Sequence, residues 1–305
     1  MYHGIINIYK EAGYTSHDVV AKLRGILRQK KIGHTGTLDP DAVGVLPVCL
    51  GVGTKLCDML TDETKEYVAE LRLGITTDTQ DMSGNILEEK EITTSVEEIE
   101  TAIYSFLGDY EQIPPMYSAL KVNGKKLYEL ARQGKEVERK ARLVRIDELE
   151  ILRIEMPVIQ IRVACSKGTY IRTLCDDIGK KLGCGGTMQS LQRTRVGNFK
   201  AENAITLSEV EAQKQNDSLD AYIIPVDQMF SRLKSVNVKD DYLKMLENGN
   251  CLYPKMIGST GIFDDKEQVR IYNGQGVFFG IYQYEKDTKT LYPAKMFLPG
   301  KEGEK

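Results

Sequence analysis

The residue best placed to do chemistry is Asp39, which lies inside an unusual loop sequence. The stretch from Gly33 to Pro47, GHTGTLDPDAVGVLP, holds three glycines and two prolines, which favour a shaped loop over a helix or strand. Pro40 restricts the residue before it to extended or turn backbone, so the loop should present the Asp39 carboxylate in one orientation. On composition alone, an ordinary turn with an exposed acid explains this stretch at least as well.

Together, Asp39, Tyr67 and Arg172 form a set that could act on a nucleotide. A carboxylate can be a covalent nucleophile, and glycosidases use carboxylates at sugar carbons. Such work needs the ionised acid, and a neighbouring guanidinium would hold the pKa of the carboxyl low and fix its orientation. An enzyme that acts on a base within folded nucleic acid must first draw that base from the stack, and an aromatic side chain then receives it.

The elements that must position Asp39 can be predicted from hydrophobic spacing. Residues 4–10 alternate like a strand, and Ser16 can cap a helix that ends near Lys31 and leads into the loop. The apolar run over residues 45–52 that follows the loop is typical of a buried strand.

The other two residues of the set have their own elements. Tyr67 falls in an alternating strand over residues 65–73. A strand over residues 158–165 leads to a junction at Gly168 and then to a helix with Arg172 in its first turn. A cation there opposes the helix dipole, so Arg172 should have a buried carboxylate partner.

The remaining pattern predicts a mixed α+β protein with a small β-rich part near its C-terminus. Capping boxes at Ser95–Glu98 and Thr206–Glu209 predict two more helices. Further strands are expected over residues 144–154, 269–272, 277–282 and 291–297, and the helix after Ser95 should turn Val96, Ile99, Ile103 and Phe106 inward.

Charge is strongly uneven along the chain, although the net charge is only −3. Residues 121–145 hold nine Lys and Arg against three Glu, a balance of +6, whereas residues 58–111 hold fifteen acids and three bases, a balance of −12. We expect one face to meet phosphates and another only solvent, although a charge run is often just a solvated face.

The composition predicts a soluble globular protein. The 305 residues, 41% hydrophobic and 28% charged, suffice for one large domain and a smaller one. No stretch approaches the roughly 20 apolar residues of a membrane span, and no leader pattern opens the sequence, so a cytoplasmic location is expected. The six cysteines form no CxxC pair and only three histidines accompany them, which is not a zinc pattern.

Four ordered segments resemble the signatures of one enzyme family, the TruB family of bacterial tRNA pseudouridine-55 synthases. The resemblance runs from residue 2 to about residue 230. It implies an α+β pseudouridine synthase fold over residues 1–232, with a mixed, largely antiparallel sheet and flanking helices. Residues 233–305 resemble, more loosely, a PUA domain, which is an RNA-binding barrel. The four segments are GHTGTLDP (33–40), KEY (65–67), PMYSALK (115–121) and SKGTYIR (166–172).

The resemblance implies a role for each matching residue. Asp39 matches the aspartate that attacks the target uridine, so that the base detaches, turns and is rejoined to the ribose through carbon. Tyr67 matches the tyrosine that stacks on the flipped base, and Arg172 matches the arginine paired with the carboxylate. His34 matches a histidine that enters the RNA loop, and Lys10 matches a lysine that supports the active-site loop. The residues assigned to substrate RNA are Lys10, His34, Tyr170, Lys121, Lys125, Lys126, Arg132, Arg142 and Arg193.

The same resemblance implies the substrate and the partners. Residues 121–145 match an RNA-clasping insertion, and the expected substrate is the T-stem-loop of tRNA. No cofactor, no metal, no membrane and no obligatory protein partner are expected, and a monomer is the default.

Several alternatives stay open at this point. Tyr67 could be simple core, His34 could cap a surface turn, and Lys10 could be an ordinary strand-end lysine. A guide-RNA-dependent synthase has a similar catalytic core, but the acidic segment over residues 76–111 and the full-length insertion favour the standalone enzyme. A non-catalytic RNA-binding or RNA-folding module would not need Asp39, and the retained chemical set argues against it.

Overall fold

A long mixed sheet forms the body of the molecule. The computed structural model describes residues 1–122, 124–258 and 262–298. Ten strands form the sheet, and neighbours along its main path run antiparallel except for a short parallel pairing of β3 with β12. This is the largely antiparallel α+β fold that the family resemblance implied. In sheet order the strands are β14 (Ile223–Ile224), β1 (Gly4–Lys10), β3 (Val43–Leu50), β12 (Gly186–Val196), β4 (Lys65–Leu73), β11 (Val158–Cys165), β10 (Arg142–Glu155) and β7 (Gly108–Gln112), with β2 (Ile32–His34) on β3 and β13 (Phe199–Lys200) on β12.

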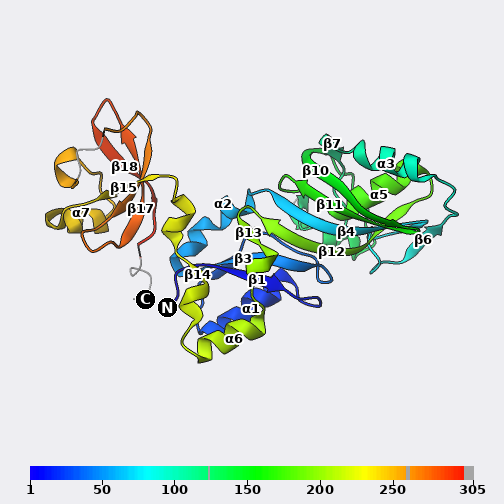
Figure 1. Ribbon diagram of the computed structural model, residues 1–305, viewed down its shortest axis with the longest axis horizontal. Helices are drawn as coiled ribbons and strands as arrows, with labels where there is room; N and C mark the ends of the chain where they lie inside the picture. The colour runs from blue at the N-terminus through cyan, green and yellow to red at the C-terminus, as the bar shows by residue number, and fades with distance from the viewer. Residues whose placement is uncertain (123, 259–261, 299–305) are drawn as a thin grey trace.

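Helices cover the sheet in two groups and bury two cores. In Figure 1, α1 and α6 lie against the half of the sheet that contains β1 and β3, and α3 and α5 lie against the half that contains β10 and β11. Leu23 of α1 and Leu174 of α5 are wholly buried in these two cores, and burial of such a side chain contributes about 1.5–3 kcal/mol. The helices are α1 (Ser16–Leu27), α2 (Cys57–Thr61), α3 (Val96–Tyr104), α5 (Ile171–Leu182) and α6 (Leu207–Gln215).

The start of α1 differs from the prediction in a way that affects the site. Thr15, not Ser16, is the N-cap: its hydroxyl accepts from the Asp18 amide at 3.1 Å, and the Asp18 carboxylate accepts from the Thr15 amide at 2.9 Å. Ser16 is thereby free to turn inward, where its hydroxyl accepts from the Leu38 amide at 2.9 Å. The helix start is therefore bonded to the loop that carries the candidate nucleophile.

Two other details also correct the prediction. Helix α1 ends at Leu27 and not near Lys31, because Arg28 adopts a left-handed backbone with φ 51° that stops the helix. In α3, Val96 points outward and is 47% exposed, because it is the first helical residue and the buried stripe begins only at Ile99.

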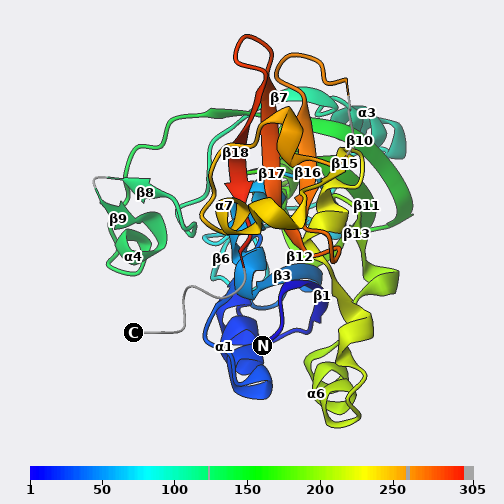
Figure 2. The ribbon, with the colours of Figure 1, turned by 90° about the vertical axis from the view of Figure 1, so that its left-hand side faces the viewer.

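Two short excursions leave the main sheet. One is a hairpin of β5 (Ile75–Thr77) and β6 (Ile86–Glu89). The other contains β8 (Lys121–Val122), β9 (Lys125–Lys126) and α4 (Leu127–Ala131), and Figure 2 shows it standing away from the body. Residue 123 of the predicted insertion lies outside the described residues, and the last part of that insertion, from Arg142, already belongs to β10.

A second, four-stranded sheet forms the C-terminal β-rich part, and Phe297 at its end shares a buried apolar cluster with Ile5 of β1 and Val45 of β3. Phe297 lies 5.8 Å from Phe230 and 5.6 Å from Phe278, measured between ring centroids. Residues 259–261 and 299–305 of this predicted part lie outside the described residues. No helix in the described ranges is both long and apolar enough to cross a membrane. The elements are β15 (Lys234–Asn237), α7 (Leu243–Glu247), β16 (Gln268–Tyr272), β17 (Phe278–Glu285) and β18 (Thr290–Met296).

Candidate active site

Asp39 lies on the loop between β2 and β3, and that loop is bonded to its surroundings on both sides of the acid. Thr35 contacts the Pro47 carbonyl twice, through its amide at 3.2 Å and its hydroxyl at 3.1 Å. Just before the acid, the Leu38 amide donates to the Ser16 hydroxyl at 2.9 Å, and just after it the Pro40 carbonyl accepts from the Gly13 amide at 3.0 Å. These bonds fix the backbone that presents the carboxylate, which is the condition for a preorganised catalytic group.

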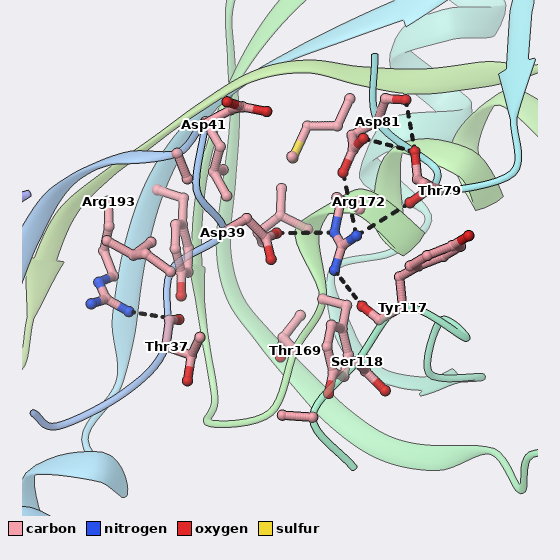
Figure 3. Close-up of a pocket in the computed structure, with 18 of the residues that line it drawn as sticks. Thr37, Asp39, Asp41, Thr79, Asp81, Tyr117, Ser118, Thr169, Arg172 and Arg193 are labelled. Atoms are coloured by element: carbon pink, nitrogen blue, oxygen red, sulfur yellow. Dashed lines mark hydrogen bonds and ion pairs between the residues drawn. The ribbon is translucent and has the colours of Figure 1, made fainter. Parts of the chain in front are cut away.

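Two buried cations hold the same loop. The Lys10 ammonium donates to the Pro40 carbonyl at 2.9 Å and to two other carbonyls. The Arg193 guanidinium donates to the Val45 carbonyl at 2.7 Å and to the Thr37 carbonyl at 3.5 Å, and Figure 3 shows the second of these bonds. Each side chain is only 1% exposed. Both were predicted to contact RNA, and this burial corrects that prediction. The geometry fits the loop support that the resemblance implied for Lys10.

Gly44 permits the close approach of β12 that brings Arg193 under the loop. Its φ is +108°, and a Cβ atom at this position would lie 2.2 Å from the Arg193 carbonyl oxygen. Only glycine satisfies both conditions, because larger residues avoid this backbone region and would collide with the neighbouring strand. The glycine of the loop sequence thus serves the pairing of β3 with β12.

Arg172 organises the other side of the site (Figure 3). Its Nε lies 3.0 Å from Oδ2 of Asp39, so the buried arginine of α5 has the carboxylate partner that its place in the first turn predicted. The guanidinium also donates to the Asp81 carboxylate at 3.3 Å and to the carbonyls of Tyr117 at 2.9 Å and Thr79 at 3.3 Å. These acceptors compensate a cation that the helix dipole disfavours.

The pKa of Asp39 is raised above its usual value, which corrects the low pKa predicted from sequence. Burial raises it, Arg172 lowers it, and the nearby Asp81 raises it again. The guanidinium is shared between two carboxylates, so it replaces only part of the hydration that Asp39 loses. The Asp39 side chain keeps 39% of its surface exposed, and a substrate can reach it.

The carboxylate opens into a cleft of about 1360 Å³, and Tyr67 and Tyr170 are among the four tyrosines that line it. Tyr67 lies on β4, and Tyr170 is the residue that directly precedes α5. Burial raises the pKa of both phenols, so both are protonated at neutral pH. They offer flat apolar surface beside the acid.

The other predicted RNA residues lie at different distances from the cleft. Arg132 and Arg142 line it. The lining residues within the described chain do not include His34, Lys121, Lys125 or Lys126. His34 is half-buried at the end of β2, where its Nδ1 accepts from the Gly36 amide at 3.3 Å. Lys126 and Arg132 each lie 5.4 Å from the ring centroid of Tyr128, which also lines the cleft.

Sequence reasoning missed Asp81, although it bonds to Arg172. It lies in the acidic stretch that was interpreted as a solvated face, and its contact depends on how the β5–β6 hairpin packs against α5. The available signal was a polar run over residues 76–85 between two short apolar segments, which is typical of a shaped loop. That run could have drawn attention to the loop, but not to its partner.

Comparisons with known proteins match nearly the whole chain to one family. Residues 24–171 match the TruB family pseudouridylate synthase N-terminal domain, and residues 172–231 match the tRNA pseudouridylate synthase B C-terminal domain. The chain is 52% identical to tRNA pseudouridine synthase B of Lachnoclostridium phytofermentans, covering 97% of this chain and 100% of that protein. It is 43% identical to the protein of that name from Clostridioides difficile, covering 96% and 99%.

Solved structures with a similar fold also match this chain, at lower sequence identity. A Cbf5–Nop10–Gar1 complex contains a chain that is 29% identical, with a TM-score of 0.70 over 97% of this chain and 85% of that chain. An H/ACA RNP bound to a substrate RNA containing 2′-deoxyuridine contains one that is 27% identical, with a TM-score of 0.69 over 97% and 86%. With its sequence relatives, its fold and the Asp39–Arg172 pair in agreement, this chain belongs to the TruB family of pseudouridylate synthases.

Proposed function

We propose that this protein isomerises one uridine in the T-loop of tRNA, at position 55, to pseudouridine, with Asp39 as the nucleophile. The observation that carries the proposal is the 3.0 Å ion pair between Asp39 and Arg172 in a cleft of about 1360 Å³. The relatives that match nearly the full chain are named tRNA pseudouridine synthase B, which supports tRNA as the substrate.

The reaction rearranges bonds within one nucleoside and consumes nothing else. Attack by the Asp39 carboxylate, at the base or at the sugar carbon C1′, leads to cleavage of the bond between C1′ and N1. The base then turns, C5 bonds to C1′, the bond between Asp39 and the nucleoside breaks, C5 loses a proton and N1 gains one. Carboxylate, product and enzyme return to their starting charges, so the chain needs no external oxidant or reductant.

Each neighbour of Asp39 has a distinct part in this proposal. Arg172 fixes the orientation of the carboxylate and favours its ionised form. Tyr67 supplies the surface on which the extruded uracil stacks. Because burial raises the pKa of Tyr67, its phenol is a poor base at neutral pH, which favours stacking over proton removal.

Substrate RNA is held, in this proposal, by cations of residues 121–145, of which Arg132 and Arg142 also line the cleft. The exposed cations of residues 121–145 bind phosphates of the T-arm. Residues 1–232 form the catalytic domain, and residues 233–305 form a PUA-like domain that contacts the same RNA. A single chain contains the complete set around Asp39, which supports a monomer that acts on tRNA in the cytoplasm without an obligatory protein partner.

A guide-RNA-dependent synthase is the second candidate. The similarity to chains of a Cbf5–Nop10–Gar1 complex and of an H/ACA RNP, at 27–29% identity, favours it. The relatives at 43–52% identity favour the standalone enzyme more strongly, because they match nearly the whole chain under one name.

An assay without guide RNA separates these functions. Purified protein is incubated with an unmodified tRNA transcript, and pseudouridine is mapped at single-nucleotide resolution. We expect one product site in the T-loop, and no product on a transcript in which cytidine replaces that uridine. Tight binding without product would contradict the proposal and favour the guided enzyme or a non-catalytic RNA-binding module.

A further inference from the structure

Gln80 lies between Thr79 and Asp81, the two residues of the β5–β6 loop that bind Arg172. The backbone conformation of Gln80 is unusual. Thr79 offers its carbonyl and Asp81 its carboxylate to the same guanidinium nitrogen of Arg172, both at 3.3 Å. Gln80, between them, has φ 64°, a left-handed conformation that residues other than glycine seldom adopt. Non-glycine residues keep such a conformation where surrounding contacts enforce it.

The side-chain amide of Gln80 supplies those contacts by bridging to helix α5. Its Nε2 donates to the Asp176 carboxylate at 2.7 Å, and its Oε1 accepts from the Thr173 hydroxyl at 2.7 Å. Both partners are buried, and Lys180 also binds Asp176, at 2.5 Å. The amide thus binds the helix one residue and one turn beyond Arg172 itself.

We infer that Gln80 is a positioning residue for the reaction: its bridge to α5 fixes Thr79 and Asp81 against Arg172 and thereby aims the Arg172 Nε at Asp39. This inference rests on the proposed function, because it assigns Gln80 an effect on the chemical step. It does not require Gln80 to touch the substrate.

The loop has independent attachments that should keep it folded without this side chain. The Met188 amide donates to the Gln80 carbonyl at 3.0 Å, and the Met82 amide donates to the Met188 carbonyl at 3.1 Å. These backbone bonds to β12 remain when the Gln80 amide is removed. A substitution should therefore loosen the partners of Arg172 without unfolding the hairpin.

Two variants separate the bridge from the backbone conformation. Gln80→Gly accepts a positive φ and removes the amide, whereas Gln80→Asn tolerates a positive φ and keeps an amide that is one methylene too short. Gln213→Ala is the matched control, since it removes a glutamine that accepts from Ser218 at 2.6 Å on α6. For both Gln80 variants we expect a single-turnover rate at least tenfold lower, with the Kd for tRNA within threefold and the Tm within a few degrees of wild type. The control should match wild type.

The route through Arg172 is tested by a double variant. If Gln80 acts by placing the loop partners of Arg172, Gln80→Gly should cost less than threefold in an Asp81→Asn background, because the shared interaction is already lost. A full tenfold loss in that background would overturn the inference, as would wild-type rates for both single variants. Failure of both variants to fold would also overturn it, because the side chain would then be structural.

A crystal structure of Gln80→Gly gives a readout that does not depend on activity. We expect the distance between Arg172 Nε and Asp39 Oδ2 to exceed 4 Å, and an unchanged pair would overturn the inference. If wild type and Gln213→Ala form no pseudouridine, the proposed function fails, and this structure still decides whether Gln80 positions the pair.

Discussion

Basic residues have different roles in two regions of the molecule, the Asp39 loop and the insertion. Lys10 and Arg193 are buried under the Asp39 loop and give their N–H groups to backbone carbonyls. Lys121, Lys125 and Arg132 of the insertion are exposed on a segment that stands away from the body (Figure 2). The same side-chain types thus shape the catalytic loop in one place and, in our proposal, hold RNA in the other. Burial and hydrogen-bond partners, not charge counts, distinguish them.

The two groups should also differ in energetics. A buried cation that satisfies several carbonyls is costly to remove, because the carbonyls lose their partners in a region without water. An exposed cation contributes little to folding, since solvent replaces its contacts. Its attraction to phosphates is screened by salt, whereas the buried contacts are not.

The largest effect on stability and rate is expected for Arg193→Met. Loss of the buried guanidinium leaves the carbonyls of Val45 and Thr37 without this donor and frees the loop. We expect about 2–4 kcal/mol less unfolding free energy and a single-turnover rate lower by about 100-fold, with tRNA affinity nearly unchanged. Urea unfolding and rapid-quench kinetics measure both quantities. Arg195→Met, on the same strand but paired with Glu66 at 3.6 Å, is the control that should keep its rate.

Neutralising the insertion should give the opposite pattern. We expect Lys125→Gln, Lys126→Gln and Arg132→Gln together to weaken tRNA binding about tenfold near 0.15 M salt and to lower the slope of log K against log salt by about 2–3. The Tm and the rate at saturating tRNA should stay near wild type. An unchanged salt slope would contradict the proposal that these cations bind phosphates of the RNA. The control neutralises Arg153, Lys181 and Lys200, which are exposed outside the insertion.

A smaller effect should come from pH. Burial lowers the pKa of Lys10 to about 8, so the folded protein releases this proton between about pH 8 and 10.5 while the unfolded chain keeps it. Unfolding free energy from this group therefore rises across that window. The neutral amine has fewer N–H donors than carbonyl partners, so we expect kcat to fall several-fold above pH 8.

The alkaline loss of kcat should be absent in Lys10→Met, whose rate is lower throughout. Lys65 is the matched control, because burial also lowers its pKa to about 8 but it donates to the carbonyls of Thr61 and Glu63. A pH profile of Lys65→Met that has also lost this decline would contradict the assignment to Lys10.

The smallest expected effect concerns the stability of Asp39→Asn. Because burial raises the pKa of Asp39, the fold disfavours its ionised form, and the stability linked to this group is lost as pH rises through the folded pKa. The neutral amide should therefore raise the Tm at pH 7 slightly, on the order of 1 °C, and the difference should vanish at acid pH. A clear drop in Tm, measured by calorimetry, would show that the ion pair outweighs burial.

Local pattern predicted the elements that carry the site. The strand over Lys65–Leu73 and the helix over Ile171–Leu182 follow from apolar spacing and end signals within each segment. The carboxylate partner of Arg172 followed from the helix dipole, which is also a local property.

The features of the site that the sequence did not predict depend on contacts between segments that are distant in the chain. Lys10 and Arg193 are buried because β3 pairs with β12 and β1, and Asp81 contacts Arg172 because the β5–β6 hairpin packs on α5. The direction in which the pKa of Asp39 shifts depends on its burial by several segments of the chain, which no single segment specifies.

The most direct test of Asp39 as the nucleophile is the single-turnover rate of Asp39→Asn on an unmodified tRNA transcript, measured together with the Kd for that transcript. We expect a loss of at least about 1000-fold in pseudouridine formation with a Kd within threefold of wild type, because contacts between basic side chains and phosphates dominate affinity. Product formation near the wild-type rate would contradict the assignment of Asp39 as the nucleophile.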